Sequence, residues 1–206
     1  MSTFTGQAGP RTPQNNDWNR TQRGIERIVD HVVDGKYQGH PIMGKDTPID
    51  GFASIGGHSR EAILACFVDP RIQRVYCRLK EQGTHDYVRT VYEIVCRTMA
   101  HDLERLNCLV RKATKGKPDV PLPLGLFVEN GVGVCSHMAI FSSLLIEGLI
   151  HDEIIRGRVS VDRNVFWGAH AWCRYTGEDD GVIIVDPALQ YFGGLSGCRW
   201  NYSRPD

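Results

Sequence analysis

Residues 130–149, NGVGVCSHMAIFSSLLIEGL, decide the fold, because they join a glycine-containing turn to a strongly apolar helix with Cys135 at the junction. Unsatisfied backbone N–H groups and the helix dipole at such a position stabilise an anion, and a thiolate is one. Gly131 and Gly133 let the backbone turn sharply enough to present the thiol and the backbone N–H, a ready oxyanion donor. The alternative is that Cys135 is a small apolar residue at the edge of the core.

Helical periodicity dominates the sequence before this stretch. Between the first two predicted helices, residues 39–58 carry five glycines and two prolines and predict a long loop. A break with three prolines over 115–125 leads back to the turn before Cys135. Four ranges have apolar residues three to four apart and predict helices: 21–35, 59–67 with Ser59 as its N-cap, 71–82 and 84–114. Four cysteines fall in these ranges and are expected to be inert core or half-buried thiols: Cys66, Cys77, Cys96 and Cys108.

Beyond the Cys135 helix the period changes to that of strands. Three short, β-branched stretches, 153–161, 168–176 and 181–189, are separated by turn residues and predict an antiparallel meander. Helices first and a sheet afterwards predict an α+β fold. We expect residues 1–20, which are rich in Thr, Gly, Pro, Gln and Asn, to form a flexible tail, and 21–206 to form a single domain.

The last two strands carry a histidine and an aspartate. Alternation over 169–175 puts His170, Trp172 and Arg174 on one face of the strand and Ala169, Ala171 and Cys173 on the other. Asp186 ends the next apolar run, before a proline that stops the strand. His170 and Asp186 are equally far in sequence from Glu178, so a hairpin centred there brings them face to face.

A thiol, an imidazole and a carboxylate in this order form a nucleophile, a general base and an orienting group, which indicates acyl transfer. Each residue also has a plainer interpretation. Cys135 alone would be structural, His170 a hydrogen-bonded strand residue, and Asp186 before proline part of a turn. It is the combination, with workable geometry, that favours catalysis.

These residues resemble the transglutaminase-like superfamily of papain-type cysteine enzymes over Gly131–Leu189. The resemblance implies Cys135 as nucleophile, His170 as base and Asp186 as orienting acid. It also implies a papain-like/transglutaminase-like core over about 125–192, with the nucleophile helix packed on the antiparallel sheet. The matching features are Gly133, Cys135, Ala139, LLIEGLI at 144–150, Gly157, HAW at 170–172 and VDP at 185–187.

Two features depart from that family. HDEII at 151–155 is acidic where relatives often have a basic residue, and no tryptophan precedes the aspartate in the hairpin. For the second oxyanion donor, the candidates are Asn130 and Trp167. Trp172 is expected to pack beside the imidazole and shield it rather than touch substrate. His137 is expected on another helix face, as a surface or capping residue.

Composition limits the partners and the compartment. With 24 basic and 24 acidic residues the formal net charge is zero, so no overall field draws the chain to nucleic acid or an anionic membrane. The start of the sequence has no apolar signal-peptide core, and 138–150 is too short to span a bilayer. The seven scattered cysteines contain no CxxC pair, so we expect no zinc site, no metal or other cofactor, and a reducing compartment.

The sequence therefore predicts a soluble cysteine-dependent acyl-transfer enzyme that acts on a protein or peptide amide through a thioester. A lysine or small-amine acceptor would make it a transglutaminase, and water a deamidase or protease. The alternative is a non-catalytic binding or scaffold module on a degenerate papain-like fold. We expect a cytoplasmic protein. A further hypothesis is a bacterial effector, exported without a cleavable signal into a host cytoplasm, for which residues 1–20 would serve delivery.

Overall fold

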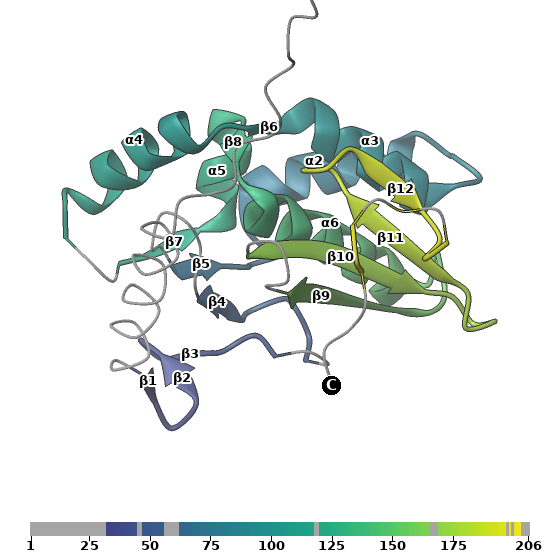
Figure 1. The fold of residues 1–206 in the computed structure, drawn as a ribbon, viewed down its shortest axis with the longest axis horizontal. Coiled ribbons are helices and arrows are strands. Elements are labelled where there is room, and N and C mark those ends of the chain that lie inside the picture. Colours follow the sequence, from purple (N-terminus) through teal and green to yellow (C-terminus); the bar gives the residue numbers. More distant parts are fainter. Residues whose placement is uncertain are drawn as a thin grey trace, which may run out of the picture.

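The structure, a computed structural model, describes residues 32–44, 47–55, 62–117, 120–164, 169–196, 198 and 200–202. These residues form a mixed α+β structure (Figure 1), which confirms the predicted class. The expected tail 1–20 lies outside the described residues, as do Ser59 and Trp167.

A four-stranded antiparallel sheet packs against a long helix at the centre of the fold (Figure 1). The helix, α6, runs over Cys135–His151 and contacts the three longest strands. It begins as predicted, and the antiparallel meander follows it, but the first strand begins five residues later than predicted, at Arg158, and a fourth strand was not predicted. The sheet has the order β12-β11-β10-β9 and consists of β9 (Arg158–Asn164), β10 (His170–Thr176), β11 (Val182–Asp186) and β12 (Tyr191–Gly193).

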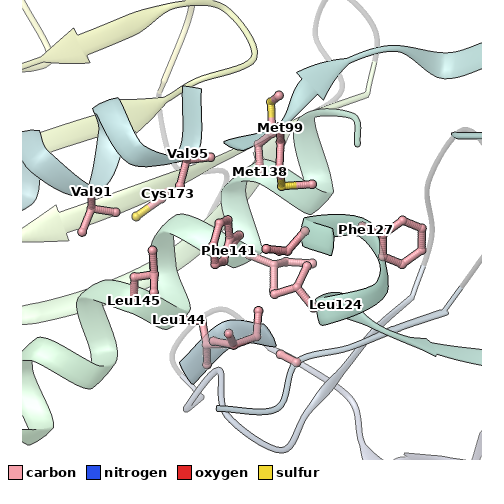
Figure 2. Close-up of a cluster of buried hydrophobic side chains, with 14 of the residues drawn as sticks. Val91, Val95, Met99, Leu124, Phe127, Met138, Phe141, Leu144, Leu145 and Cys173 are labelled. Carbon is pink, nitrogen blue, oxygen red and sulfur yellow. The ribbon is translucent and has the colours of Figure 1, made fainter. Parts of the chain in front are cut away.

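Helix α6 is buried on nearly every side, because it is apolar almost all round and is covered by other helices as well as by the sheet. Figure 2 shows Phe141 and Leu145 of α6 among side chains of α3 (Tyr87–Thr98), α5 (Leu124–Asn130) and β10. Burial of this kind contributes roughly 1.5–3 kcal/mol for each large apolar side chain, so the core fixes α6 firmly.

Three of the other helices have an aspartate as N-cap, whereas Pro123 precedes α5. The predicted helix over 71–82 is confirmed as α2 (Pro70–Glu81), where Asp69 accepts from the backbone N–H of Arg71. The prediction of one helix over 84–114 is wrong. The chain leaves the helical conformation at Met99 and forms a short strand, β6 (Ala100–His101), and Asp102 then caps a new helix, α4 (Leu103–Thr114). Amphipathic periodicity runs through both helices and conceals this break.

The helix predicted over 59–67 is also wrong, because residues 62–64 form strand β5 (Ala62–Leu64). This strand pairs antiparallel with β4 (Ala53–Ile55) and parallel with β7 (Pro121–Pro123). Periodicity alone does not separate a short apolar run in a strand from one in a helix. Cys66 therefore follows a strand and lies in no helix. β4 also lies inside the predicted loop 39–58, and α5 and β7 were not predicted.

The prediction of a helix over 21–35 is wrong at its C-terminal end. Val32 and Val33 form β1 (Val32–Val33), which is joined to β2 (Lys36–Tyr37) through two residues in the left-handed region, Asp34 at φ 51° and Gly35 at φ 71°. A third strand, β3 (His40–Pro41), pairs with β2 inside the predicted loop. Residues 21–31 of the prediction lie outside the described residues.

A single carboxylate joins this first part of the chain to the central helix. Glu147 of α6 accepts hydrogen bonds from the backbone N–H groups of Ile49, at 2.8 Å, and Asp50, at 2.9 Å. The Asp50 side chain in turn accepts from the N–H of Phe67 at 2.5 Å. Glu147 thus holds the segment before β4 against α6. Over the residues that the structure describes, no helix combines the length and apolarity needed to cross a membrane.

Candidate active site

Cys135 is the first residue of α6, and a two-stranded parallel sheet holds the turn that leads to it. In this sheet β8 (Val132–Gly133) pairs with β6, with His101 opposite Gly133. The N–H of Ala100 donates to the carbonyl of Gly131 at 3.0 Å, and that of Asp102 to Gly133 at 3.1 Å. Cys135 is only 8% exposed, so it is almost buried in the fold.

The two glycines of the turn act differently. Gly131 has φ 61°, a left-handed conformation that ends α5, as its expected role requires. Gly133 is not in that region, and what it supplies is space. A Cβ atom there would lie 2.6 Å from the terminal methyl of Met99 and 2.8 Å from the Cβ of His137. The prediction that Gly133 is needed for a sharp turn is therefore wrong. Glycine is needed there because Met99 and His137 pack too closely to leave room for a side chain.

His170 and Asp186 meet as expected, but through a different register. The hairpin pairs Cys173 with Val185 and Thr176 with Val182, so its centre lies one residue beyond Glu178. Extending this register puts Asp186 across from Trp172 rather than His170. Because strand residues two apart share a face, the imidazole still reaches diagonally, and His170 Nε2 donates to Asp186 Oδ2 at 2.6 Å.

Asp186 is almost fully buried, at 1% exposure, and three donors hold its carboxylate. Oδ2 accepts from His170 Nε2 and, at 2.8 Å, from the hydroxyl of Tyr202. Oδ1 accepts from the backbone N–H of Leu189 at 3.1 Å. A buried carboxylate with this many donors has a fixed orientation, and it fixes the imidazole that bonds to it.

The other side of the imidazole faces the thiol. Nε2 is bonded to Asp186, so Nδ1 is the ring nitrogen that remains for Cys135, whose thiol lies near enough to raise the pKa of His170. Burial lowers the pKa of His170, but the hydrogen bonds and charges of Asp186 and Cys135 outweigh burial and raise the pKa to about 9. The ring is therefore an imidazolium at neutral pH. A cysteine beside a protonated histidine is the arrangement of an activated nucleophile.

Of the residues predicted to support the site, Trp172 lies beside the imidazole and Asn130 does not serve the thiol. Trp172 is fully buried and lies beside the imidazole, with ring centroids 6.1 Å apart and planes 28° apart, which matches its expected position as a shield. Asn130 is exposed at the end of α5, and its amide Nδ2 donates to the carbonyl of Leu126 at 2.8 Å. That amide is engaged by its own helix and does not face the thiol as an oxyanion donor. Trp167 lies outside the described residues.

His137 is fully buried rather than on the surface, and its capping role is confirmed. Its Nδ1 accepts from the backbone N–H of Val134 at 3.4 Å, and its ring meets Phe127 edge-on with centroids 4.2 Å apart. Burial lowers the pKa of His137 to about 3, so the ring is neutral, as an accepting nitrogen requires.

Two aromatic residues at the site were not predicted. The ring of Trp200 meets His170 edge-on with centroids 4.9 Å apart, and Tyr202 donates to Asp186. Their alternate spacing in RWNY at 199–202 is the one local sign that they share a face.

A pocket of about 490 Å³ lies near these groups, although Cys135, His170 and Asp186 do not themselves line it. Met138 lies in its wall one turn after Cys135, and Pro187, next to Asp186, forms part of the opposite wall. Its rim is polar, with Glu93, Arg97 and His101 contributing side chains. This space between α3, β6 and the residues after β11 is large enough for a side chain or a short peptide segment.

No family model, curated protein or solved structure matches this chain. In the described ranges no group of three His, Cys, Asp or Glu side chains is placed to hold a metal ion.

Proposed function

We propose that this protein is a cysteine-dependent acyl-transfer enzyme with a papain-like/transglutaminase-like core. The observation that carries the proposal is the grouping of Cys135, His170 and Asp186, in which the imidazole bonds a buried carboxylate at 2.6 Å and lies near the thiol. The position of Cys135 at the start of α6, packed on an antiparallel sheet, adds support from the fold.

In the proposed reaction the sulfur of Cys135 attacks an amide carbonyl carbon. The carbonyl oxygen becomes an oxyanion, which the backbone N–H of Cys135 at the start of α6 can stabilise. The C–N bond then breaks, and His170 gives its Nδ1 proton to the departing amine, which leaves a thioester on Cys135. His170 next takes a proton from the acceptor, the acceptor attacks the thioester, and the Cys135 thiolate is released.

The substrate is a protein or peptide amide, either a glutamine side chain or a peptide bond. An amine acceptor gives a cross-link and water gives hydrolysis, and exclusion of water from the site decides between them. Cys135 is only 8% exposed, and limited access of bulk water to the thiol would favour an amine acceptor.

The first test is a short iodoacetamide pulse near pH 6, followed by peptide mapping of the seven cysteines. An ordinary thiol is almost wholly protonated at this pH. We expect Cys135 to react at least about tenfold faster than Cys77 or Cys108, although these two are exposed and Cys135 is buried. His170→Ala should abolish the difference, whereas His151→Ala, which removes an exposed histidine far from the site, should preserve it.

If Cys135 reacts no faster than the exposed thiols, the proposal fails. If it does react faster, a glutamine-containing protein is incubated with and without a primary amine and its mass is measured. Gain of the amine with loss of ammonia identifies cross-linking. Conversion of the amide to an acid in both samples identifies deamidation, and chain cleavage identifies proteolysis.

One observation favours the alternative of a non-catalytic binding module. The Asn130 amide donates to its own helix, so this candidate for the second oxyanion donor is already engaged. Full biological function in a Cys135→Ala variant would support the binding module. Loss of function with unchanged thermal stability would exclude it.

A further inference from the structure

The segment Trp200–Tyr202 lies across the face of the sheet opposite α6. Three hydrogen bonds hold it there. Asn164 Nδ2 donates to the carbonyl of Asn201 at 2.6 Å, Arg174 Nη2 donates to that of Tyr202 at 2.7 Å, and the Tyr202 hydroxyl donates to Asp186. Two of these bonds use backbone carbonyls of the segment, so they fix the path of its main chain.

The side chain of Arg174, which bonds the carbonyl of Tyr202, is itself held in place. Arg174 Nε donates to Asp162 Oδ2 at 2.6 Å, and Asp162 is almost fully buried. Ser160 donates to the other carboxylate oxygen at 2.8 Å. An arginine held in this way on β10 presents its remaining N–H to the segment in one geometry.

The ring of Tyr202 has little freedom. It stacks on Tyr191 with centroids 5.3 Å apart and meets Trp172 edge-on at 5.2 Å, and only 2% of Tyr202 is exposed. Its hydroxyl therefore reaches Asp186 Oδ2 from a fixed direction. Trp200, two residues earlier, covers His170 with its ring edge.

We propose that Tyr202 and Trp200 are positioning residues for the His170–Asp186 pair. The Tyr202 hydroxyl fixes the plane of the carboxylate together with Leu189, and Trp200 keeps water from the bond between the imidazole and the carboxylate. Neither residue reaches the reacting atoms, so both act through His170. The proposal deepens the proposed function and rests on it for its catalytic meaning.

The test follows the Nε2 proton of His170 by NMR in the full chain. A proton in a buried 2.6 Å bond to a carboxylate resonates downfield of the backbone amides and exchanges slowly with water. Tyr202→Phe keeps the ring packing and removes only the hydroxyl. We expect exchange of this proton to become on the order of tenfold faster, the scale of one hydrogen bond to a charged group. Alkylation of Cys135 near pH 6 should slow by a similar factor.

Tyr191→Phe is the matched control. Its ring belongs to the same stack, but its hydroxyl donates to the carbonyl of Gly194 and not to Asp186. We expect Tyr191→Phe to leave the exchange rate of the His170 proton unchanged, even if this variant's thermal midpoint falls as far as that of Tyr202→Phe. A second variant, Arg174→Lys, keeps a positive charge beside Asp162 but loses the second N–H, which bonds the carbonyl of Tyr202. It should therefore also speed exchange of the His170 proton.

Wild-type exchange in both Tyr202→Phe and Arg174→Lys would overturn the proposal, and so would equal acceleration in Tyr191→Phe. These outcomes are separate from failure of the proposed function. If Cys135 is unreactive in the wild-type protein while the His170 proton still responds to Tyr202, the positioning role stands and the acyl-transfer mechanism does not.

Discussion

At the scale of single residues, two buried histidines have opposite electrostatic surroundings. His170 touches a carboxylate and a thiol, and its pKa is raised to about 9. His137 lies among apolar side chains, and burial alone lowers its pKa to about 3. The same side chain is therefore charged in one place and neutral in the other at physiological pH, and each state depends on the folded structure.

The raised pKa of His170 predicts a loss of stability at alkaline pH. The folded pKa lies above the ordinary 6.5, so the stabilisation is complete below about pH 6.5 and is lost as the pH rises through about 9. The contribution is at most about 3 kcal/mol. Urea unfolding across this range should show the wild-type advantage over His170→Gln shrinking as the pH rises. A constant difference would contradict the buried ion pair.

The lowered pKa of His137 predicts the opposite dependence. The unfolded chain takes up a proton below about pH 6.5 while the folded protein stays neutral to about pH 3, so stability falls as the solution is acidified. His137→Asn should weaken this acid dependence by up to about 5 kcal/mol between those limits, although the substitution lowers stability at neutral pH. Unfolding curves near pH 7 and near pH 4.5 measure it, and equal acid slopes in the two proteins would be the contrary result.

At the scale of elements, the position of Cys135 depends on close contact between the Gly133 turn and its neighbours. Gly133→Ala would put a methyl group 2.6 Å from Met99 and 2.8 Å from His137, so we expect a loss of about 1–3 kcal/mol of unfolding free energy and slower labelling of Cys135. Gly116→Ala is the control, since its turn has φ 74° but nothing within 4 Å. It should lose stability through strain and label normally.

The elements also show which predictions local sequence can support. Cys135, His170 and Asp186 were found because helix onset, strand alternation and a strand-ending proline are local signals. The strand at 62–64 was missed because its partners, β4 and β7, include residues almost 60 positions away. The break at 99–101 was missed for a similar reason, since β6 exists only by pairing with β8. Tyr202 likewise meets Asp186 through folding of distant segments.

At the scale of the whole molecule, Glu147 connects the first part of the chain to the buried helix α6. Glu147→Ala leaves the N–H groups of Ile49 and Asp50 without their acceptor, and we expect the free energy of unfolding to fall by about 2 kcal/mol. Glu147→Gln keeps one acceptor oxygen and should lose less. Glu81→Ala, at the exposed end of α2, should change almost nothing in the same urea titration.

The hydrogen bond between Tyr202 and Asp186 has a consequence for biosynthesis. A ribosome makes the thiol of Cys135 first, the imidazole and the carboxylate next, and the phenol of Tyr202 last. A polypeptide interrupted between residues 187 and 199 carries Cys135, His170 and Asp186 but lacks the aromatic cover over His170 and Asp186. Such incomplete chains would hold an uncovered His170–Asp186 pair, and only translation past residue 202 completes the site.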